Sequence, residues 1–396
     1  MTRRSGGSSG LKLALVFGLA LGAFVVAARP AAAYPQFQFS SGTQRCAQCH
    51  YAPAGFGLLT SWGRDESADT ISRGGDGAFL HGLVTTPSWL ALGGDIRLAT
   101  IRNDVGGAYS PEYASFPMQT DLYARVAFGD TGVSLYLAGG LRGTTRPGAQ
   151  TAFSHVEAVI SREHYLMWKP SASGPYVRLG RFYAPYGLRM VEHIYYVRRY
   201  TGFNLYEETY NLSGGYLEED WEVHATAFTP PPSKFPDPLQ SVGMRGSGGA
   251  VYGERRFASM VAVALQSRVS VASEQKLIEG GALGKVWLEG AHMLAMGELD
   301  FLHRSVTGGA SYSQTVAFLG LTFFPIKGLM AGAAFEQYQE DIRVGTLARN
   351  AFDLEINLFP WAHVEFVLLG RYQITGGGNA DGEAASLGML QLHYYL

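Results

Sequence analysis

Both cysteines of this chain lie within four residues of each other, and a histidine follows the second one directly. Cys46, Cys49 and His50 form the pattern C-x-x-C-H in the stretch RCAQCHYAP, residues 45–53. This pattern is typical of haem c attachment, in which two thiols add to the two haem vinyl groups and the histidine binds the iron. The sequence therefore predicts one covalent haem c, anchored by Cys46 and Cys49, with His50 as its proximal ligand.

Three other interpretations of the cysteine pair fit less well. A structural zinc site needs four Cys or His ligands, and the chain has no second cysteine pair. A thioredoxin-like redox motif needs a βαβ context, which the neighbouring sequence does not show. A short-loop disulfide suits an oxidising compartment, but it gives no role to His50.

The second axial position of the iron has one candidate near the motif. Between Tyr51 and Pro117 there is no Met or Lys, and the only histidine is His81. We therefore expect His81 to be the distal ligand if the N-terminal segment supplies one. The alternatives are an open position or a histidine of the remaining chain, such as His155, His193 or His224.

The first 33 residues have the features of an export signal. Arg3 and Arg4 precede an apolar stretch over residues 13–28, and three alanines stand before Tyr34. We expect a cleaved signal peptide over residues 1–33, with a retained membrane anchor as the alternative. No later segment has about 18 consecutive apolar residues, so the sequence predicts no further transmembrane helix.

The composition after the signal is that of a membrane barrel. The chain is 47% hydrophobic and only 16% charged, whereas soluble domains carry about 25% charged residues. Its net charge of −2 does not favour nucleic acid as a partner. In lipid, only helices and closed barrels pair every backbone polar group. An exported, apolar chain without membrane helices is therefore expected to form a β-barrel in contact with outer-membrane lipid.

Alternation of apolar and polar residues supports this expectation. In FDLEINLF, residues 352–359, Leu354 and Ile356 share one face while Asp353 and Glu355 share the other. A period of two over about ten residues is typical of outer-membrane barrel strands. We predict sixteen strands, near 91–102, 116–129, 131–142, 151–168, 175–183, 204–217, 219–229, 242–254, 258–270, 275–286, 291–303, 312–324, 328–340, 349–359, 363–374 and 385–396.

The predicted connections also alternate in length. Even-numbered strands end in tight links, and most odd-numbered strands end in longer loops, as in an outer-membrane barrel. We therefore predict an all-β fold: an antiparallel barrel over residues 91–396 with an N-terminal haem-bearing segment over residues 34–90. Because about fifty residues bury too little surface to enclose a haem alone, we expect this segment to plug the lumen of the barrel, which would supply the missing walls.

The layout resembles the fused monohaem cytochrome–porins, which are outer-membrane iron-oxidising cytochromes of bacteria. The resemblance is specific over about residues 34–64, and the remaining chain resembles porins in general. Departures are the absence of Ala-Arg after Phe37, wider spacing, and Trp62 in place of Phe. The matching elements are Pro35-Gln36-Phe37 and Ser41-Gly42 before Cys46, followed by Pro53, Leu58-Leu59 and Trp62-Gly63-Arg64.

This resemblance implies electron transfer across the outer membrane. An extracellular donor, ferrous iron in the family, would reduce the haem, and a periplasmic carrier such as a soluble cytochrome c would accept the electron. Two rivals remain: a diffusion porin with a plug, and a barrel that sheathes other cytochromes. The longest predicted connection, residues 184–203, is expected on the external side, where Glu192 and His193 are candidates for an external metal site, with a pore-lining Arg/Glu ladder as the alternative.

Overall fold

The computed structural model describes residues 35–40, 43–105, 110–141, 159–204, 207–231, 246–376 and 383–396. The predicted signal peptide, Ser41, Gly42 and His155 lie outside these ranges. Among the described residues, none of the helices is both long enough and apolar enough to cross a membrane.

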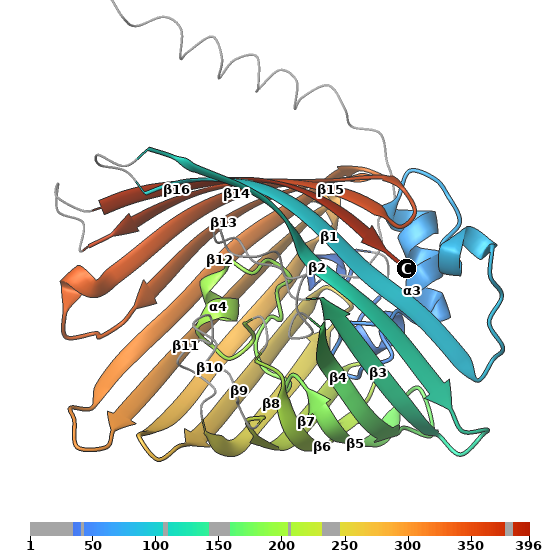
Figure 1. Cartoon of the computed structure of the whole chain (residues 1–396), viewed down its shortest axis with the longest axis horizontal. Helices are drawn as coiled ribbons and strands as arrows, with labels where there is room; N and C mark the ends of the chain where they lie inside the picture. Colours follow the sequence, from blue (N-terminus) through green and yellow to red (C-terminus); the bar gives the residue numbers. More distant parts are fainter. Residues whose placement is uncertain are drawn as a thin grey trace, which may run out of the picture.

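Within the described ranges the chain forms one closed barrel of sixteen strands, as predicted (Figure 1). Every strand pairs with its sequence neighbours in antiparallel fashion, and β1 closes the ring on β16. The strands are β1 Leu90–Asp104, β2 Glu112–Ala127, β3 Val133–Leu141, β4 Val159–Trp168, β5 Gly174–Phe182, β6 Thr209–Leu217, β7 Trp221–Thr229, β8 Ser247–Phe257, β9 Val261–Val271, β10 Gln275–Leu288, β11 Met293–Val306, β12 Tyr312–Ile326, β13 Leu329–Gln339, β14 Ala348–Trp361, β15 Val364–Thr375 and β16 Glu383–Tyr395.

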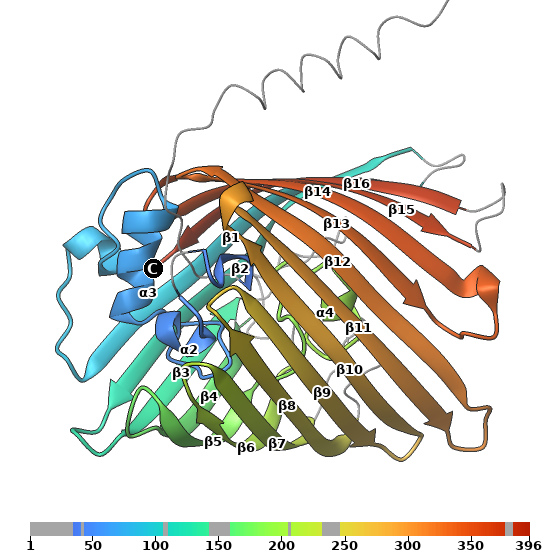
Figure 2. The same cartoon turned by 180° about the vertical axis from the view of Figure 1, so that it is seen from behind.

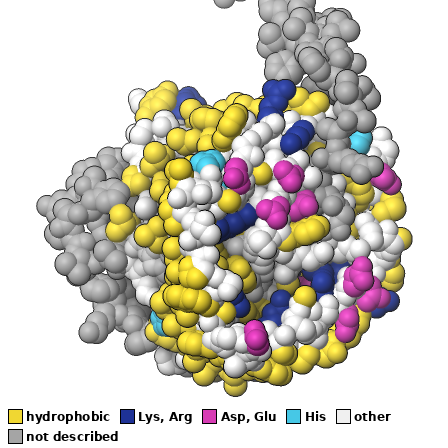
Figure 3. All heavy atoms as spheres, turned by 90° about the vertical axis from the view of Figure 1, so that its right-hand side faces the viewer, with side chains coloured by type: hydrophobic (Ala, Val, Ile, Leu, Met, Phe, Trp, Pro, Cys, Tyr) yellow, Lys and Arg dark blue, Asp and Glu magenta, His cyan; other side chains and the backbone are white. Residues whose placement is uncertain are grey.

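The barrel wall turns apolar side chains outward and polar side chains inward. In β14, Leu354 is 69% exposed, whereas Asp353 is 2% and Glu355 is 5% exposed on the lumen side. A soluble sheet would bury its apolar face, so this arrangement fits a wall whose outer face meets lipid. Seen end-on, a group of charged side chains lies inside a mostly apolar rim (Figure 3).

The two ends of the barrel differ in their connections. Seven short turns lie at one end, at residues 128–132, 169–173, 218–220, 258–260, 289–292, 327–328 and 362–363. Most connections at the other end are longer. Since outer-membrane barrels have short turns on the periplasmic side, we take the short-turn end as periplasmic. The C-terminus and the N-terminal segment both lie at this end (Figures 1 and 2).

The N-terminal segment is a chain of short helical turns that enters the short-turn mouth. These are η1 Pro35–Phe37, α2 Cys46–Cys49, α3 Ser61–Glu66, the π-helical η2 Ser67–Ile71 and η3 Phe79–Gly82. Arg73 N–H donates to Phe359 O at 2.9 Å, and Ala362 N–H donates to Gly74 O at 2.7 Å, which fastens the segment to the β14–β15 turn.

The long connection between β5 and β6 folds into the lumen from the opposite end. It carries the short helix α4 Tyr196–Arg199, seen inside the ring of strands in Figure 1. Its apolar residues share one buried cluster with the N-terminal segment: Leu188, Met190 and Tyr196 pack in the same core as Phe37 and Cys49. The core of this barrel is therefore in its lumen. The remaining short helices, η6 Glu289–Ala291 and η7 Gly345–Leu347, lie in connections between strands.

Candidate functional site

The C-x-x-C-H motif occupies a single helical turn. Cys46 and Cys49 are the first and last residues of α2, so their side chains lie on one side of it. The Gln48 amide oxygen accepts from the N–H of Gln44 at 2.8 Å and of Arg45 at 2.9 Å, which caps the start of the turn. The His50 N–H donates to Cys46 O at 2.9 Å. The three predicted haem residues are thus held together by the backbone itself.

The chain folds back after His50, so that Leu58 and Leu59 lie beside Tyr51 and His50 and orient the histidine. Residues Tyr51 and Leu58 are joined by a backbone hydrogen bond of 3.2 Å, and His50 forms a β-bridge with Leu59. His50 Nδ1 lies 3.3 Å from Gly57 O. When Nδ1 donates its proton to that carbonyl, Nε2 carries the lone pair that an iron ligand requires.

Two glycines allow the chain to pass close to the motif. A Cβ on Gly63 would lie 2.3 Å from Cys49 O, so only glycine lets α3 approach the backbone of the motif. Gly55 has φ of +87°, and a Cβ there would lie 3.2 Å from the Cys46 Cβ. Thr60 completes the link, because its hydroxyl donates to Gln48 O at 2.6 Å and accepts from Gly63 N–H at 3.1 Å.

Cys46, Cys49 and His50 line one cavity with about 1060 Å³ of unfilled space. This space includes volume that is open to solvent, and its lining is mainly apolar, as in most ligand sites. Its walls come from the N-terminal segment, the inward-folded connection, and strands β1, β2, β10, β14 and β16. Apolar lining residues include Phe37, Leu59, Ile71, Leu188 and Phe359, and the cationic ones are Arg45, Arg97, Arg189 and Lys285.

The chemistry of this cavity fits covalent haem better than zinc. Both cysteines are free thiols. Burial raises the pKa of Cys46, and it raises the pKa of Cys49 to about 12, so both stay uncharged at neutral pH. Zinc binds the thiolate, whereas a thioether to haem carries no charge. No group of three or more His, Cys, Asp or Glu side chains in the described ranges could hold a metal ion. The apolar walls suit a porphyrin ring, and Arg45, which has no ion-pair partner among the described residues, suits one of its carboxylates.

The structure does not bring His81 to this cavity. The His81 ring packs 4.6 Å from the ring of His363, and its Nδ1 lies 3.3 Å from Asp76 O. His224 is also elsewhere, with its Nδ1 2.6 Å from the Tyr176 hydroxyl. Neither residue lines the cavity. The expectation that His81 supplies the distal ligand therefore has no geometric support.

His393 lines the cavity instead, and sequence reasoning missed it. It lies on the inner face of β16, 3% exposed. Its Nδ1 is 2.6 Å from Glu365 Oε2, and its Nε2 is 2.8 Å from Asp95 Oδ1. A metal-binding histidine has a carboxylate on one ring nitrogen and the metal on the other, whereas both ring nitrogens of His393 contact carboxylates here. The alternation in LQLHYYL, residues 390–396, placed His393 between outward leucines and was the available signal.

Glu192 and His193 lie inside the barrel, not on its external surface. His193 lines a second cavity with about 520 Å³ of unfilled space, which shares Phe56, Arg97 and Val191 with the first. Burial raises the pKa of Glu192 to about 7 and lowers the pKa of His193. The inward fold that places them here also joins the connection to the N-terminal segment, since Arg189 donates to Ala54 O at 2.7 Å.

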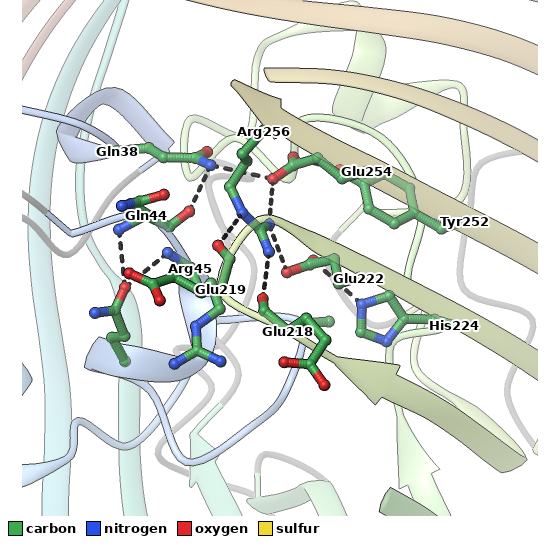
Figure 4. Close-up of polar contacts among 12 residues, drawn as sticks. Gln38, Gln44, Arg45, Glu218, Glu219, Glu222, His224, Tyr252, Glu254 and Arg256 are labelled. Carbon is green, nitrogen blue, oxygen red and sulfur yellow. Dashed lines mark hydrogen bonds and ion pairs between the residues drawn. The ribbon is translucent and has the colours of Figure 1, made fainter. Parts of the chain in front are cut away.

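Gln38 of the N-terminal segment meets a polar network formed by β7, β8 and the turn before β7 (Figure 4). Gln38 donates to Glu254 Oε1 at 3.1 Å. Arg256 pairs with Glu254 at 2.7 Å and with Glu222 at 2.9 Å, and it also donates to the backbone of Glu218 and Glu219. The Arg256 pairs lie within the barrel wall, and Gln38 joins the N-terminal segment to this buried network.

Comparisons with known proteins show the fold of outer-membrane porins. No family model matches the chain, and the search of curated proteins found no match in sequence. OprB of Pseudomonas putida is similar in structure, with a TM-score of 0.59 and 12% identity over 78% of this chain and 94% of that chain. The anion-selective porin of Comamonas acidovorans has a TM-score of 0.57 and 12% identity over 78% and 99%. OmpF of Salmonella typhi, in complex with daunomycin, has a TM-score of 0.57 and 8% identity over 78% and 97%. At these identities the likeness establishes the fold, and the chain is a sixteen-stranded barrel of the porin type.

Proposed function

We propose that this chain is an outer-membrane barrel that carries one covalent haem c in its periplasmic mouth and transfers electrons across the outer membrane. The observation that carries the proposal is the cavity of about 1060 Å³, into which Cys46, Cys49 and His50 all face. A chance C-x-x-C-H motif would have no reason to place all three residues in the lining of one mainly apolar space.

Each residue has a distinct role in this proposal. Cys46 and Cys49 would anchor the porphyrin, and His50, oriented by Gly57 O, would bind the iron through Nε2. His393 lines the same cavity, and its two ring nitrogens contact the carboxylates of Glu365 and Asp95, so it would set the charge around the haem rather than bind the iron. The haem would supply one-electron redox chemistry, while the lumen excludes water and sets the surrounding charge.

The electron donor is proposed from the family resemblance. Ferrous iron outside the cell is the donor in the cytochrome–porins, and a soluble periplasmic carrier is the acceptor. The inward-folded connection supports an external donor. It runs from the external end of the lumen to the wall of the proposed haem cavity, where Arg189 donates to Ala54 O.

A reduced-minus-oxidised absorption spectrum tests the redox proposal. Outer-membrane fractions with the wild-type chain and with Cys49→Ala are reduced with dithionite or with ferrous iron. Haem c bands with both reductants, lost in the variant, are the expected result. Bands with dithionite alone would reject iron as the donor, and the absence of bands in the wild type would reject the cytochrome.

A second candidate function is the diffusion of solutes, which the likeness to porins and to the channel DcaP of Acinetobacter baumannii favours. The filled lumen argues against a wide pore, because Phe37, Leu188 and Tyr196 share one buried cluster across it. Conductance across a planar bilayer separates the two functions. A steady ion conductance of the wild type in salt solution would support solute diffusion. The absence of conductance would support a plugged barrel.

A further inference from the structure

A groove on the periplasmic side of the haem motif reaches His50 from outside. Its outer end is formed by exposed residues of α3 and the β4–β5 turn, including Trp62, which is 49% exposed, and Pro170. Its inner end is His50, which is 8% exposed. Arg45 and His50 line both this groove and the haem cavity, so they form the wall between them.

The charges of this groove are all positive. Arg45, Arg125 and Lys169 line it, and no Asp or Glu does. In the part of the chain that the structure describes, none of the three has an ion-pair partner within 4.0 Å, although Arg125 covers the Tyr51 ring at 4.5 Å and Arg45 donates to Ser173 Oγ at 2.9 Å. The Nε atoms of Arg45 and Arg125 are buried and lack a hydrogen-bond partner.

Three cations lie together in this groove without an acid. Other inner cations of the described residues do meet acids: Arg162 contacts Asp121 at 3.1 Å and Glu208 at 2.6 Å, and Lys285 contacts Glu254 at 3.1 Å. Burial and the neighbouring Arg45 and Arg125 lower the pKa of Lys169 to about 8. Like charges held together without acids leave a site that an anionic group would stabilise.

The position of the groove restricts what can enter it. Arg125 shares the lumen face of β2 with the buried Asp121, whereas Leu122, 66% exposed, faces outward toward lipid. Lipid headgroups surround the outer wall and do not reach a groove inside the mouth. An occupant must therefore come from the periplasm, and it must present carboxylates next to an apolar contact for Trp62.

We propose that this groove docks the acidic surface of a soluble periplasmic electron carrier. The inference rests on the proposed function, since it assigns the carrier its place against the ligand side of the haem. Opposite charges steer such encounters and fix their register. Electrons would leave the haem through the wall made by His50 and the α2 turn, in the direction of the docked carrier.

Binding of a defined probe to the full-length protein in detergent tests the proposal. The probe is a soluble, acidic, monohaem cytochrome c, and its control is the same cytochrome with surface carboxylates converted to amides. The variants are Arg125→Gln/Lys169→Gln and Lys169→Gln alone. The matched control, Arg255→Gln/Lys327→Gln, removes two cations at the same end but outside the groove; Arg255 is an exposed partner of Asp220 at 2.8 Å.

The acidic cytochrome should bind the wild type and the matched control equally. The double groove variant should bind it about tenfold more weakly, as expected for losing two favourable charge contacts. Raising the ionic strength from about 0.01 M to about 1 M, which shortens the screening length from about 30 Å to about 3 Å, should remove most of the difference. The proposal would be overturned if the groove variants bound the probe as tightly as the wild type, or if the amidated probe bound as tightly as the acidic one. It would also be overturned if the groove bound inorganic phosphate but not the acidic cytochrome.

A haem-free chain separates this inference from the proposed function. Cys46→Ala/Cys49→Ala should keep the salt-dependent binding, because neither thiol lines the groove. Unchanged haem bands in Arg125→Gln/Lys169→Gln would show that the variant is folded. If the wild type binds the probe but has no haem bands, the docking groove stands and the cytochrome proposal fails. If haem bands are present and the groove variants bind the probe like the wild type, the cytochrome proposal stands and the docking groove fails.

Discussion

Gly63 is the residue at which the packing of the haem motif is tightest. A Cβ there would lie 2.3 Å from Cys49 O and 2.9 Å from Cys49 Cα. Because these are backbone atoms, Gly63→Ala must displace α3 or the motif. We expect it to destabilise the N-terminal segment by about 1–3 kcal/mol and to lower haem incorporation, measured as haem per folded barrel. Gly345→Ala, where no atom lies within 4 Å of the added Cβ, is the control. Equal haem content in both variants would contradict this packing.

Lys169 gives the docking groove a pH dependence. Its pKa is lowered to about 8, first by burial and then by Arg45 and Arg125, so it is charged near pH 7 and largely neutral near pH 9. Binding of an acidic cytochrome should therefore weaken as the pH rises through about 8. Lys169→Arg should remove this dependence, because arginine stays protonated throughout this range. A wild-type affinity that is constant from about pH 7 to about pH 9 would contradict the assignment.

At the scale of residues, the sequence predicted the contacts between residues that are adjacent in the chain, and it did not predict contacts between distant residues. Cys46, Cys49 and His50 are adjacent along the chain, so their spacing alone brings them together. His81 was expected as a distal ligand for its nearness in sequence, but the chain between carries it outside the cavity to His363. His393 reaches the cavity only because β16 pairs with β1, which no local pattern predicts.

The strands were predictable because each must alternate between lipid and lumen. Every predicted strand overlaps one observed strand, and the short turns follow the even-numbered strands as expected. β6 differs from the predicted bounds, since it begins at Thr209 and not at residue 204. Asn204 belongs to the inward-folded connection, where its N–H donates to the Glu207 carboxylate at 3.0 Å. This local hydrogen bond replaces pairing with the next strand.

The inward fold of the β5–β6 connection could not be predicted from the sequence. It depends on hydrogen bonds between residues far apart in the chain, such as the Leu188 N–H to Glu298 Oε2 at 2.7 Å and Tyr195 to Glu355 at 3.0 Å. Length alone indicated a functional loop, but not the surface it would contact.

Replacing residues 188–199 by a Gly-Ser linker of equal length should open the lumen. The apolar contacts of Leu188, Met190 and Tyr196 with the barrel wall would be lost, and a flexible linker does not restore them. We expect a new ion conductance across planar bilayers. The same replacement at residues 341–347, in the mostly exposed β13–β14 connection, is the control and should leave the barrel closed. Equal conductance in the wild type and both variants would show that the connection does not fill the lumen.

On the scale of the whole molecule, the barrel is an apolar exterior around a charged and plugged interior. Leu354, 69% exposed in the middle of β14, is expected to contact the hydrocarbon of the bilayer. Leu354→Arg should destabilise the folded barrel in lipid vesicles by about 2–4 kcal/mol, measured by urea titration. Leu83→Arg, at an 85% exposed position on the N-terminal segment, should change the free energy of unfolding little. Equal effects would mean that β14 does not face lipid.

The covalent attachment of haem is the central claim, and the intact mass of the purified protein measures it most directly. Under denaturing conditions, which release any non-covalent cofactor, the wild-type chain should be heavier than its polypeptide by one haem. Cys46→Ala/Cys49→Ala, purified in the same way, should have the mass of its polypeptide alone. A wild-type mass equal to that of the bare polypeptide, from cells that attach haem c to other proteins, would contradict the account and leave a plugged porin.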